Sequence, residues 1–335
     1  MTRDGSVFGT AEVAVIIVNY GTANLALAAV ASVLSRSSGS RTIAVHLVDN
    51  ASHGDDARHL SAEIAARGWR DRVTLFRETV NHGFGGGNNV VLERLARQPN
   101  RPKYVFLLNP DALLENDAIT ILADFLDAHP KAAVAGARIE KPGGIPVTAA
   151  FRFPGLASTF ADAISFGPIS RLFAASRVPL EPDLTTGPVD WVAGAAMMAR
   201  FDAMRDAGNF DLGYFLYYEE VDLMRALARR GSEVWYVAEA RVTHFEGAST
   251  GVNSGEACRK RRPAYWYHSW QYYFRKNHGR LYALAAAAAW IIGAGVNRLV
   301  AGLRRRPPAA PLHFFGDFWA GACRPLIGLR AAHHE

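Results

Sequence analysis

Hydrophobic positions in the first half of the chain alternate between continuous apolar runs and runs at helical spacing. The run VAVIIVNY (13–20) is apolar and β-branched, which is typical of a strand buried on both faces of a parallel sheet. We predict strands at 13–20, 42–50, 73–78, 103–111 and 132–139, and helices at 25–34, 55–68, 86–97 and 116–128. This alternation predicts a three-layer α/β domain around a parallel or mostly parallel sheet.

The middle of the chain has a different pattern. Residues 140–188 carry seven prolines among scattered aromatic residues, which predicts a long connection with little regular structure. After it we predict a strand at 190–200, a helix at 218–230 and two strands near 233–238 and 241–244. The stretch GASTGVNSG (247–255) has the composition of a flexible segment.

The last part of the chain interleaves basic and aromatic residues over 259–280 and then has an uncharged apolar run over 281–296. This run is shorter than the roughly 20 residues that a helix needs to span a bilayer. Its Tyr, Trp and Arg flanks favour an interfacial or re-entrant helix, and a packed core helix is the alternative. We therefore divide the chain into an α/β domain, 1–255, and a helical, membrane-associating appendage, 256–335.

Charge follows the same division. Residues 259–335 contain thirteen Lys and Arg against two acids, so they carry about +11 of a chain whose net charge is +6. Such asymmetry indicates a polyanionic partner, either nucleic acid or an anionic lipid surface. The two cysteines, Cys258 and Cys323, exclude a disulfide framework. Residues 1–14 hold no apolar core of signal-peptide length, so we expect a cytoplasmic protein.

Polar clusters follow four of the predicted strands, at the carboxyl ends where α/β sheets bind ligands. The clusters are Asn19, Asp49 with Asn50, Asn81, and Asn109 with Asp111. A buried carboxylate such as Asp111 needs a compensating charge, and Mg²⁺ or Mn²⁺ shared with substrate phosphates is one source. Asn-Pro-Asp is equally a good turn and helix-cap sequence.

Three further motifs carry candidate chemistry. The glycine-rich NHGFGGGNN (81–89) allows close backbone approach to a ligand at a helix start, although it fits neither phosphate-loop template. The acids Glu219, Glu220 and Asp222 crowd one helix start, either as an ordinary capped terminus or as a partly buried site for a general base. His244, at a strand end, is either structural or part of a site.

Together these segments resemble the glycosyltransferase family 2 proteins of the GT-A fold. The resemblance is greatest to the bacterial rhamnosyltransferase-like branch that builds cell-envelope polysaccharides, and it covers roughly residues 12–250. It depends on the order and spacing of IIVNY, LVDNAS, NHGFGGGNN, LLNPDA, WVAGAAMM, FLYYEEVDLMR and VTHFEGAS.

The resemblance implies a role for each matching position. A nucleotide-sugar site is implied for Val18, Asn19, Tyr20, Asp49, Asn50, Asn81, Gly83, Asn88, Asn109 and Asp111. Metal binding is implied for Asp111 and His244, and acceptor binding for Trp191, Gly194, Ala195 and Asp222, although Asp222 is equally a structural carboxylate. The catalytic base falls on Glu220, with Glu219 beside it as the alternative. The chain departs from the family in having Asn-Pro-Asp for D-x-D and Glu for the commoner Asp base.

The reaction so implied is a single in-line displacement that inverts the anomeric carbon. The expected donor is dTDP-L-rhamnose, with UDP-sugars next, and the expected acceptor is a saccharide on a polyprenyl diphosphate carrier. The enzyme would act peripherally at the inner face of the cytoplasmic membrane, held there through 259–306. The basic run 259–262 either closes over phosphates or is simply solvated.

Three other classes of protein are compatible with parts of the sequence. A nucleotidyltransferase would carry a basic, glycine-rich loop after its first strand, and NYGTANLAL has no Lys or Arg. A nucleic-acid-binding protein would leave the ordered acidic motifs unexplained, so no nucleic-acid partner is expected. A non-catalytic protein that binds sugar nucleotides remains as the alternative to an enzyme.

Overall fold

The chain folds as two compact units in a computed structural model that describes residues 11–37, 39–165, 167–245 and 260–329. The first unit consists of Met1–Phe151, Leu180–Leu212 and Leu223–Ser254. The second consists of Arg152–Pro179, Gly213–Asp222 and Gly255–Glu335, so the predicted C-terminal region is joined there by two earlier segments. The expected flexible segment 247–255, Cys258 and Arg259 lie outside the described residues.

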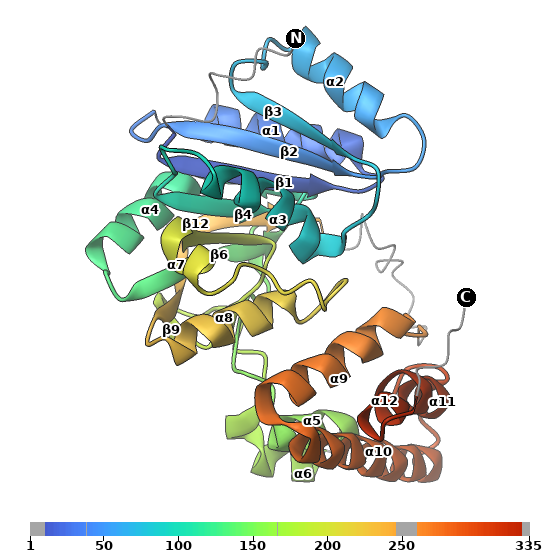
Figure 1. Cartoon of the computed structure of the whole chain (residues 1–335). Coiled ribbons are helices and arrows are strands. Elements are labelled where there is room, and N and C mark those ends of the chain that lie inside the picture. The colour runs from blue at the N-terminus through green and yellow to red at the C-terminus, as the bar shows by residue number, and fades with distance from the viewer. Residues whose placement is uncertain (1–10, 38, 166, 246–259, 330–335) are drawn as a thin grey trace. The chain divides into compact units, whose positions relative to one another are not determined.

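The first unit is built on a sheet of ten strands in the order β3-β2-β1-β4-β11-β6-β12-β5, with β7 on β6 and β9 on β12 (Figure 1). Its strands are β1 Val13–Asn19, β2 Ile43–Asn50, β3 Val73–Glu78, β4 Tyr104–Leu108, β5 Ala112–Leu114, β6 Ala132–Lys141, β7 Ile145–Pro146, β9 Gly187–Val189, β11 Ala196–Arg200 and β12 Glu233–His244. A separate pair joins β8 (Ala150–Phe151) to β10 (Trp191–Val192). The core of the sheet is apolar on both faces, and Val13, Val15 and Ile17 of β1 are fully buried.

Strand directions correct one expectation. Strands β1 to β4 and the pair β6–β12 run parallel, but β11 lies antiparallel between β4 and β6. The chain enters β11 from the carboxyl edge of β4, where the Asn109 N–H donates to the Ala195 carbonyl at 2.8 Å. The sheet is therefore mixed, not parallel or mostly parallel. The two strands expected near 233–238 and 241–244 are one strand, β12, whose register on β6 shifts between Val237 and Arg241.

Helices cover the sheet as the sequence predicts. Helices α1 and α3 both pack on β1, and α4 packs on β6 and β12. The helices are α1 Ala23–Arg36, α2 Asp56–Ala66, α3 Gly83–Ala96, α4 Ala118–Ala128 and α7 Phe201–Asp206. Helix α8 (Glu219–Arg229) begins in the second unit and continues in the first.

The second unit is helical (Figure 1). It contains α5 Leu156–Ile164, α6 Gly167–Leu172, η1 Ala174–Ser176, α9 Ala264–His278, α10 Arg280–Leu303, α11 Phe314–Phe318, the π-helical turn η2 Trp319–Cys323 and α12 Arg324–Leu326. The expectation of little regular structure over 140–188 is thus wrong for 156–172. Helix α5 forms because it can pack on α10, where a Cβ at Gly293 would lie 2.7 Å from the Ala163 Cβ.

Helix α10 is longer than the apolar run that predicted it, with 24 residues. Within the described residues it is the one helix long and apolar enough to cross a membrane, and 39% of its most apolar stretch is buried. Buried core helices also reach this length and composition. One face of α10 packs on α5 and α9, and an aromatic cluster around Trp270, Trp290 and Phe318 fills the interior beside it.

Candidate active site

The carboxyl edge of the sheet in the first unit collects most of the predicted site residues. Register places Asn19 opposite Asp49, and the ends of β4 and β12 bring Asn109 and His244 to the same edge. The short strand β5 lies antiparallel to the end of β12 and pairs Ala112 with His244, which fixes Asp111 there too. The predicted residues on this edge are Val18, Asn19, Tyr20, Asp49, Asn50, Asn109, Asp111, Gly194, Ala195 and His244.

Asn19 organises the end of β1. Its Nδ2 donates within 3.1 Å to Asp49 Oδ1, and it also lies 3.1 Å from Ser52 Oγ and Asp56 Oδ2. Its Oδ1 accepts from the backbone N–H of Thr22 at 3.1 Å. Asp49 is only 2% exposed, so this amide fixes the direction of a buried carboxylate. The Asp49 carboxylate is therefore a hydrogen-bond acceptor held in a fixed position at the edge of the sheet.

Asn50 and Asn81 hold the loop between β3 and α3 against β2. Asn50 Nδ2 donates to Asn81 Oδ1 and to the Gly83 carbonyl, both at 3.0 Å. Asn50 Oδ1 accepts from the His82 N–H at 3.1 Å, and Asn81 Oδ1 from the Gly83 N–H at 2.9 Å. Both amides thus anchor the loop. A nucleotide contact for either remains a prediction.

The glycines of the loop lie inside helix α3, which begins at Gly83 and not at residue 86. A Cβ at Gly87 would come 2.7 Å from Val18 Cγ1, and one at Gly86 would come 2.8 Å from the His82 Cβ. Gly87 therefore lets the helix lie close on the end of β1, and Gly86 leaves room for the side chain of His82 just before the helix. Asn88, 1% exposed, donates to the Phe84 carbonyl at 2.9 Å, inside the same helix.

Asp111 and His244 come together although 133 positions separate them. His244 Nε2 lies 3.0 Å from Asp111 Oδ1 and 3.3 Å from Asn109 Nδ2. The Asp111 side chain is 2% exposed, and the Phe245 N–H donates to its backbone carbonyl at 2.9 Å. This geometry makes the pair a fixed unit at the sheet edge.

The pair fits a divalent cation that shares its coordination with a substrate. In the part of the chain that the structure describes, no three His, Cys, Asp or Glu side chains gather as a metal cluster. One carboxylate and one imidazole are too few for a closed protein cage, but Mg²⁺ and similar cations are commonly held by one or two carboxylates plus phosphate oxygens. The donor set therefore suits a metal brought with a diphosphate.

The predicted base lies in the second unit, at the start of α8. Tyr217 and Tyr218, just before the helix, both have left-handed backbone conformations, with φ of 70° and 73°. Such a conformation costs roughly 1–2 kcal/mol for each residue with a side chain, and strain of this kind clusters at functional sites. The turn aims the following acids, Glu219 and Glu220, into a buried environment.

Both acids have perturbed acidity. Burial, reinforced by the neighbouring Glu220 carboxylate, raises the pKa of Glu219 well above its ordinary value, and burial also raises the pKa of Glu220. Within the described residues, neither Glu219 Oε2 nor Glu220 Oε2 accepts a hydrogen bond. Two adjacent carboxyl groups with a free buried oxygen each are suited to exchange protons with a ligand.

Asp222 has a different environment one turn along the same helix. It is 4% exposed and accepts hydrogen bonds from Lys276 Nζ at 2.5 Å and Asn277 Nδ2 at 2.7 Å. The Tyr214 hydroxyl donates to it at 3.2 Å. These donors tie the start of α8 to α9 inside the second unit. The structure supports the structural alternative for this carboxylate, and acceptor binding remains a prediction.

The other predicted acceptor residues lie beside β11. Trp191 stacks on Phe151 with ring centroids 4.0 Å apart and an interplanar angle of 11°. Gly194 and Ala195 follow on the approach to β11. In the basic run, Arg261 pairs with Asp317, and Arg262 lies 3.9 Å from the Trp266 ring with its pKa lowered by burial. Arg262 is thus packed in the second unit and is not a solvated cation.

The family model described as "Glycosyl transferase family 2" matches residues 14–164, the segment that carries Asn19, Asp49 and Asp111. The chain contains a family 2 glycosyltransferase domain. The family 2 domain that the resemblance implied is therefore confirmed for this segment.

Relatives and structures agree with the family 2 domain. N-acetylglucosaminyl-diphospho-decaprenol L-rhamnosyltransferase of Mycobacterium tuberculosis is 31% identical over 188 residues, 53% of this chain and 61% of that protein. Rhamnosyltransferase WbbL of Escherichia coli is 26% identical over 167 residues, 49% of this chain and 61% of that protein. The match thus spans about three fifths of each relative's length. A Pyrobaculum calidifontis mannosyltransferase solved with GDP-Man and Mn²⁺ superposes with a TM-score of 0.55 at 16% identity, covering 91% of this chain and 79% of that one, which confirms the GT-A fold.

Sequence reasoning missed several residues that build the candidate site. Ser52 and Asp56 accept hydrogen bonds from Asn19 Nδ2, which also donates to Asp49. Asp56 Oδ2 also accepts a hydrogen bond from the Ala23 N–H at 3.2 Å. Asn89, 6% exposed, ties α3 to the Phe210 backbone through two hydrogen bonds. The signal for Asp56 was present, since it is the last acid of NASHGDD, but acids at a helix start are common.

Proposed function

We propose that the chain is an inverting, metal-dependent glycosyltransferase. The best candidate donor is dTDP-L-rhamnose, and the best candidate acceptor is a saccharide linked to a polyprenyl diphosphate in cell-envelope polysaccharide synthesis. The observation that carries the proposal is the contact between His244 and the buried Asp111 at the carboxyl edge of the sheet that carries the family 2 domain. The two rhamnosyltransferases among the relatives support the sugar, and the decaprenol carrier in one of their names supports the acceptor.

Asp111 and His244 would hold the Mg²⁺ or Mn²⁺, together with diphosphate oxygens of the donor. The metal, when bound, would offset the negative charge that develops on the departing diphosphate. The Mn²⁺ in the mannosyltransferase structure supports a divalent cation of this kind. Asp49, held in place by Asn19, would accept a hydrogen bond from the ring N–H of a thymine or uracil base. This acceptor suits both dTDP- and UDP-linked donors, so UDP-sugars are the second candidates.

Glu220 would be the base. The Glu219 side chain is the more buried of the two, and its pKa is raised first by that burial and then by the Glu220 charge, so Glu219 would keep its proton in preference to Glu220. Glu220 is then the carboxylate, and burial raises its pKa toward the range in which a base is most effective. It would take the proton of the acceptor hydroxyl as that oxygen bonds to the anomeric carbon and the diphosphate oxygen leaves. A single displacement of this kind inverts the anomeric centre.

The second unit would place the enzyme at the inner face of the cytoplasmic membrane. Leu281, Leu299 and Leu303 of α10 are 84%, 71% and 87% exposed, so the helix carries an apolar face that the described residues leave uncovered. Arg280 at one end and Arg304–Arg306 beyond the other flank this face. An apolar stripe with basic ends is typical of a helix that lies in the interface plane.

The test is release of nucleoside diphosphate from a panel of dTDP-, UDP- and GDP-sugars, with and without EDTA, in the presence of a bacterial lipid extract. Glu220→Gln should lower kcat by about 100-fold or more, the usual contribution of a general base, while leaving donor binding intact. Glu219→Gln should cost much less, and exposed Glu93→Gln should cost nothing. If Glu220→Gln turned over at the wild-type rate, the assignment of the base would be wrong. Donor binding with no release by any form would favour the non-catalytic alternative.

A further inference from the structure

A basic groove of about 710 Å³ lies in the second unit, between the C-terminal half of α10 and the segment that leads into α11. Helix α10 contributes Arg298 and Ala294, and the turn after it contributes Arg306. His313 and Phe315 line the opposite side. The groove is large enough for a lipid head group and is separate from every residue assigned to sugar transfer above.

The positive charge of the groove is only partly neutralised. Arg261 makes a bidentate ion pair with Asp317, with N–O distances of 2.7 and 2.6 Å. Across the described ranges, no acidic side chain pairs with Arg298 or Arg306. Two uncompensated guanidinium groups therefore face one cavity. Guanidinium groups bind phosphate oxygens in a bidentate manner, so the cavity is chemically suited to a phosphate.

Exposed apolar side chains lie next to residues of the groove in the chain. Leu299 and Leu303 lie on α10 next to Arg298 and Gly302 and are 71% and 87% exposed. Trp319, at the end of α11, is 52% exposed. A nucleic-acid backbone would leave these side chains in water, whereas a phospholipid supplies both a phosphate and an apolar boundary. The combination favours a membrane lipid over the other polyanion that the charge pattern allowed.

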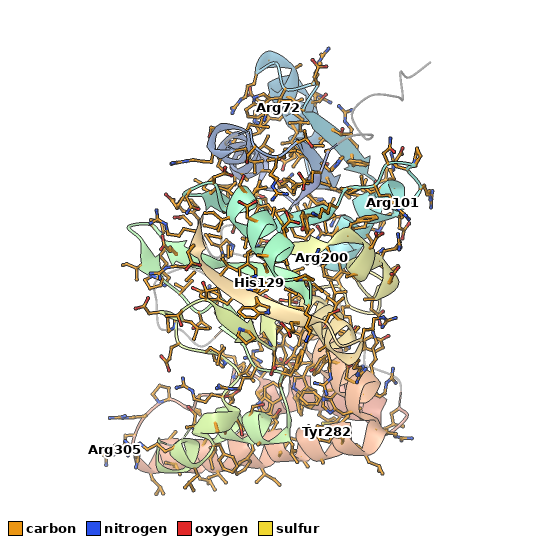
Figure 2. The ribbon with its side chains drawn as sticks, turned by 90° about the vertical axis from the view of Figure 1, so that its left-hand side faces the viewer. Arg72, Arg101, His129, Arg200, Tyr282 and Arg305 are labelled. Carbon is orange, nitrogen blue, oxygen red and sulfur yellow. The ribbon has the colours of Figure 1, made fainter. Side chains whose placement is uncertain are left out.

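The opposite face of α10 is already occupied, which limits how the helix can meet a bilayer. Gly293 packs against α5, and Asn297 Nδ2 donates to the Ile164 carbonyl at 3.0 Å. Figure 2 shows Tyr282 near one end of α10 and Arg305 just beyond the other. A helix fixed to α5 along one side has a single face left for lipid, so it lies along the surface instead of crossing it.

We propose that the groove binds the phosphate of an anionic phospholipid head group through Arg298 and Arg306, with Leu299 and Leu303 in the acyl boundary. This site rests on the membrane association in the proposed function but not on sugar transfer. Such a site would make the second unit prefer anionic phospholipids, beyond a general electrostatic attraction to negatively charged surfaces.

The test is sedimentation of the full chain with phosphatidylcholine vesicles that contain or lack phosphatidylglycerol, without any sugar nucleotide. One arginine near an anionic surface contributes about fivefold in partitioning. Arg298→Gln and Arg306→Gln should each lower partitioning onto phosphatidylglycerol vesicles by more than about tenfold. The matched control is Arg305→Gln, because Arg305 adjoins Arg306 in the chain but does not line the groove, and it should cost about fivefold or less.

Variants that preserve the positive charge distinguish a specific phosphate site from a general electrostatic attraction to the vesicle surface. Arg298→Lys and Arg306→Lys keep the charge but lose the bidentate geometry, so a phosphate site predicts a measurable loss and diffuse attraction predicts none. Equal losses for Arg305→Gln and the groove variants would overturn the proposal. Equal binding to vesicles with and without phosphatidylglycerol would also overturn it. A second probe is single-stranded DNA: if the groove variants lost binding to DNA but kept binding to vesicles, the groove would be a nucleic-acid site and the proposal would be wrong. Because Glu220→Gln should leave vesicle binding unchanged, failure here and failure of the proposed catalysis are distinguishable.

Discussion

His46 provides a test of how completely the first unit buries its sheet. It lies in the middle of β2, is 1% exposed, and meets Phe76 edge-on with ring centroids 6.0 Å apart. Burial disfavours the charged imidazolium and lowers the pKa of His46 from 6.5 to about 4. The folded unit therefore holds a histidine that resists protonation across the mildly acidic range.

The sign and size of the effect follow from linkage. Because the folded pKa lies below the unfolded one, the stability contribution is fully present above pH 6.5 and is lost as the pH falls through about 4. At about 1.36 kcal/mol per pKa unit, the whole shift corresponds to about 3 kcal/mol, and roughly 2 kcal/mol of it is lost by pH 5.

The assay is urea unfolding of the wild type and His46→Leu at pH 7.5, 6 and 5. Leucine cannot titrate, so the difference in unfolding free energy between the two proteins should shift by roughly 2 kcal/mol in favour of the variant between pH 7.5 and 5. Any contact that leucine loses acts equally at every pH and cancels from this shift. The control is Leu47→Ala, beside His46 in β2, because it removes buried packing but no titratable group and should show no such shift. A difference for His46→Leu that did not depend on pH would refute the reasoning.

Two further predictions concern packing and the acidic pair. Gly136→Ala should lower the unfolding free energy by about 1–3 kcal/mol, because its Cβ would lie 2.5 Å from the Val192 Cβ. In thermal melting, Gly136→Ala should cost less in a Val192→Gly background, which lacks that Cβ, than in the wild type. The control Gly187→Ala should cost much less, because its Cβ would meet only the Thr185 carbonyl, at 3.8 Å. Glu219→Gln should stabilise the protein progressively as the pH rises above 4.5, the pKa of the unfolded carboxyl. Above that pH the unfolded state gains free energy by ionising Glu219, whereas the folded state, in which the pKa is raised, does not, and glutamine removes this difference. Melting curves with equal gains at pH 4.5 and pH 7.5 would contradict that assignment.

The sequence alone determined the framework of the first unit. Short, β-branched apolar runs such as 13–20 are typical of strands buried on both faces, and the helical stretches between them are suited to cover that sheet. Polar residues at the run ends, Asn19 and Asp49 among them, then had to meet at one edge because parallel strands share a direction. These inferences hold because each depends on local periodicity within one element.

Contacts between distant segments were decided only by tertiary structure. The antiparallel course of β11, the packing of α5 on α10 and the 3.0 Å approach of His244 to Asp111 all join residues far apart in the chain. Local patterns carry no information about such pairings, because each segment is compatible with many partners until the whole core is packed. The perturbed acidity of Glu219 and Glu220 has the same origin: burial in the folded chain raises both pKa values, and two adjacent acids in the sequence carry no information about that burial.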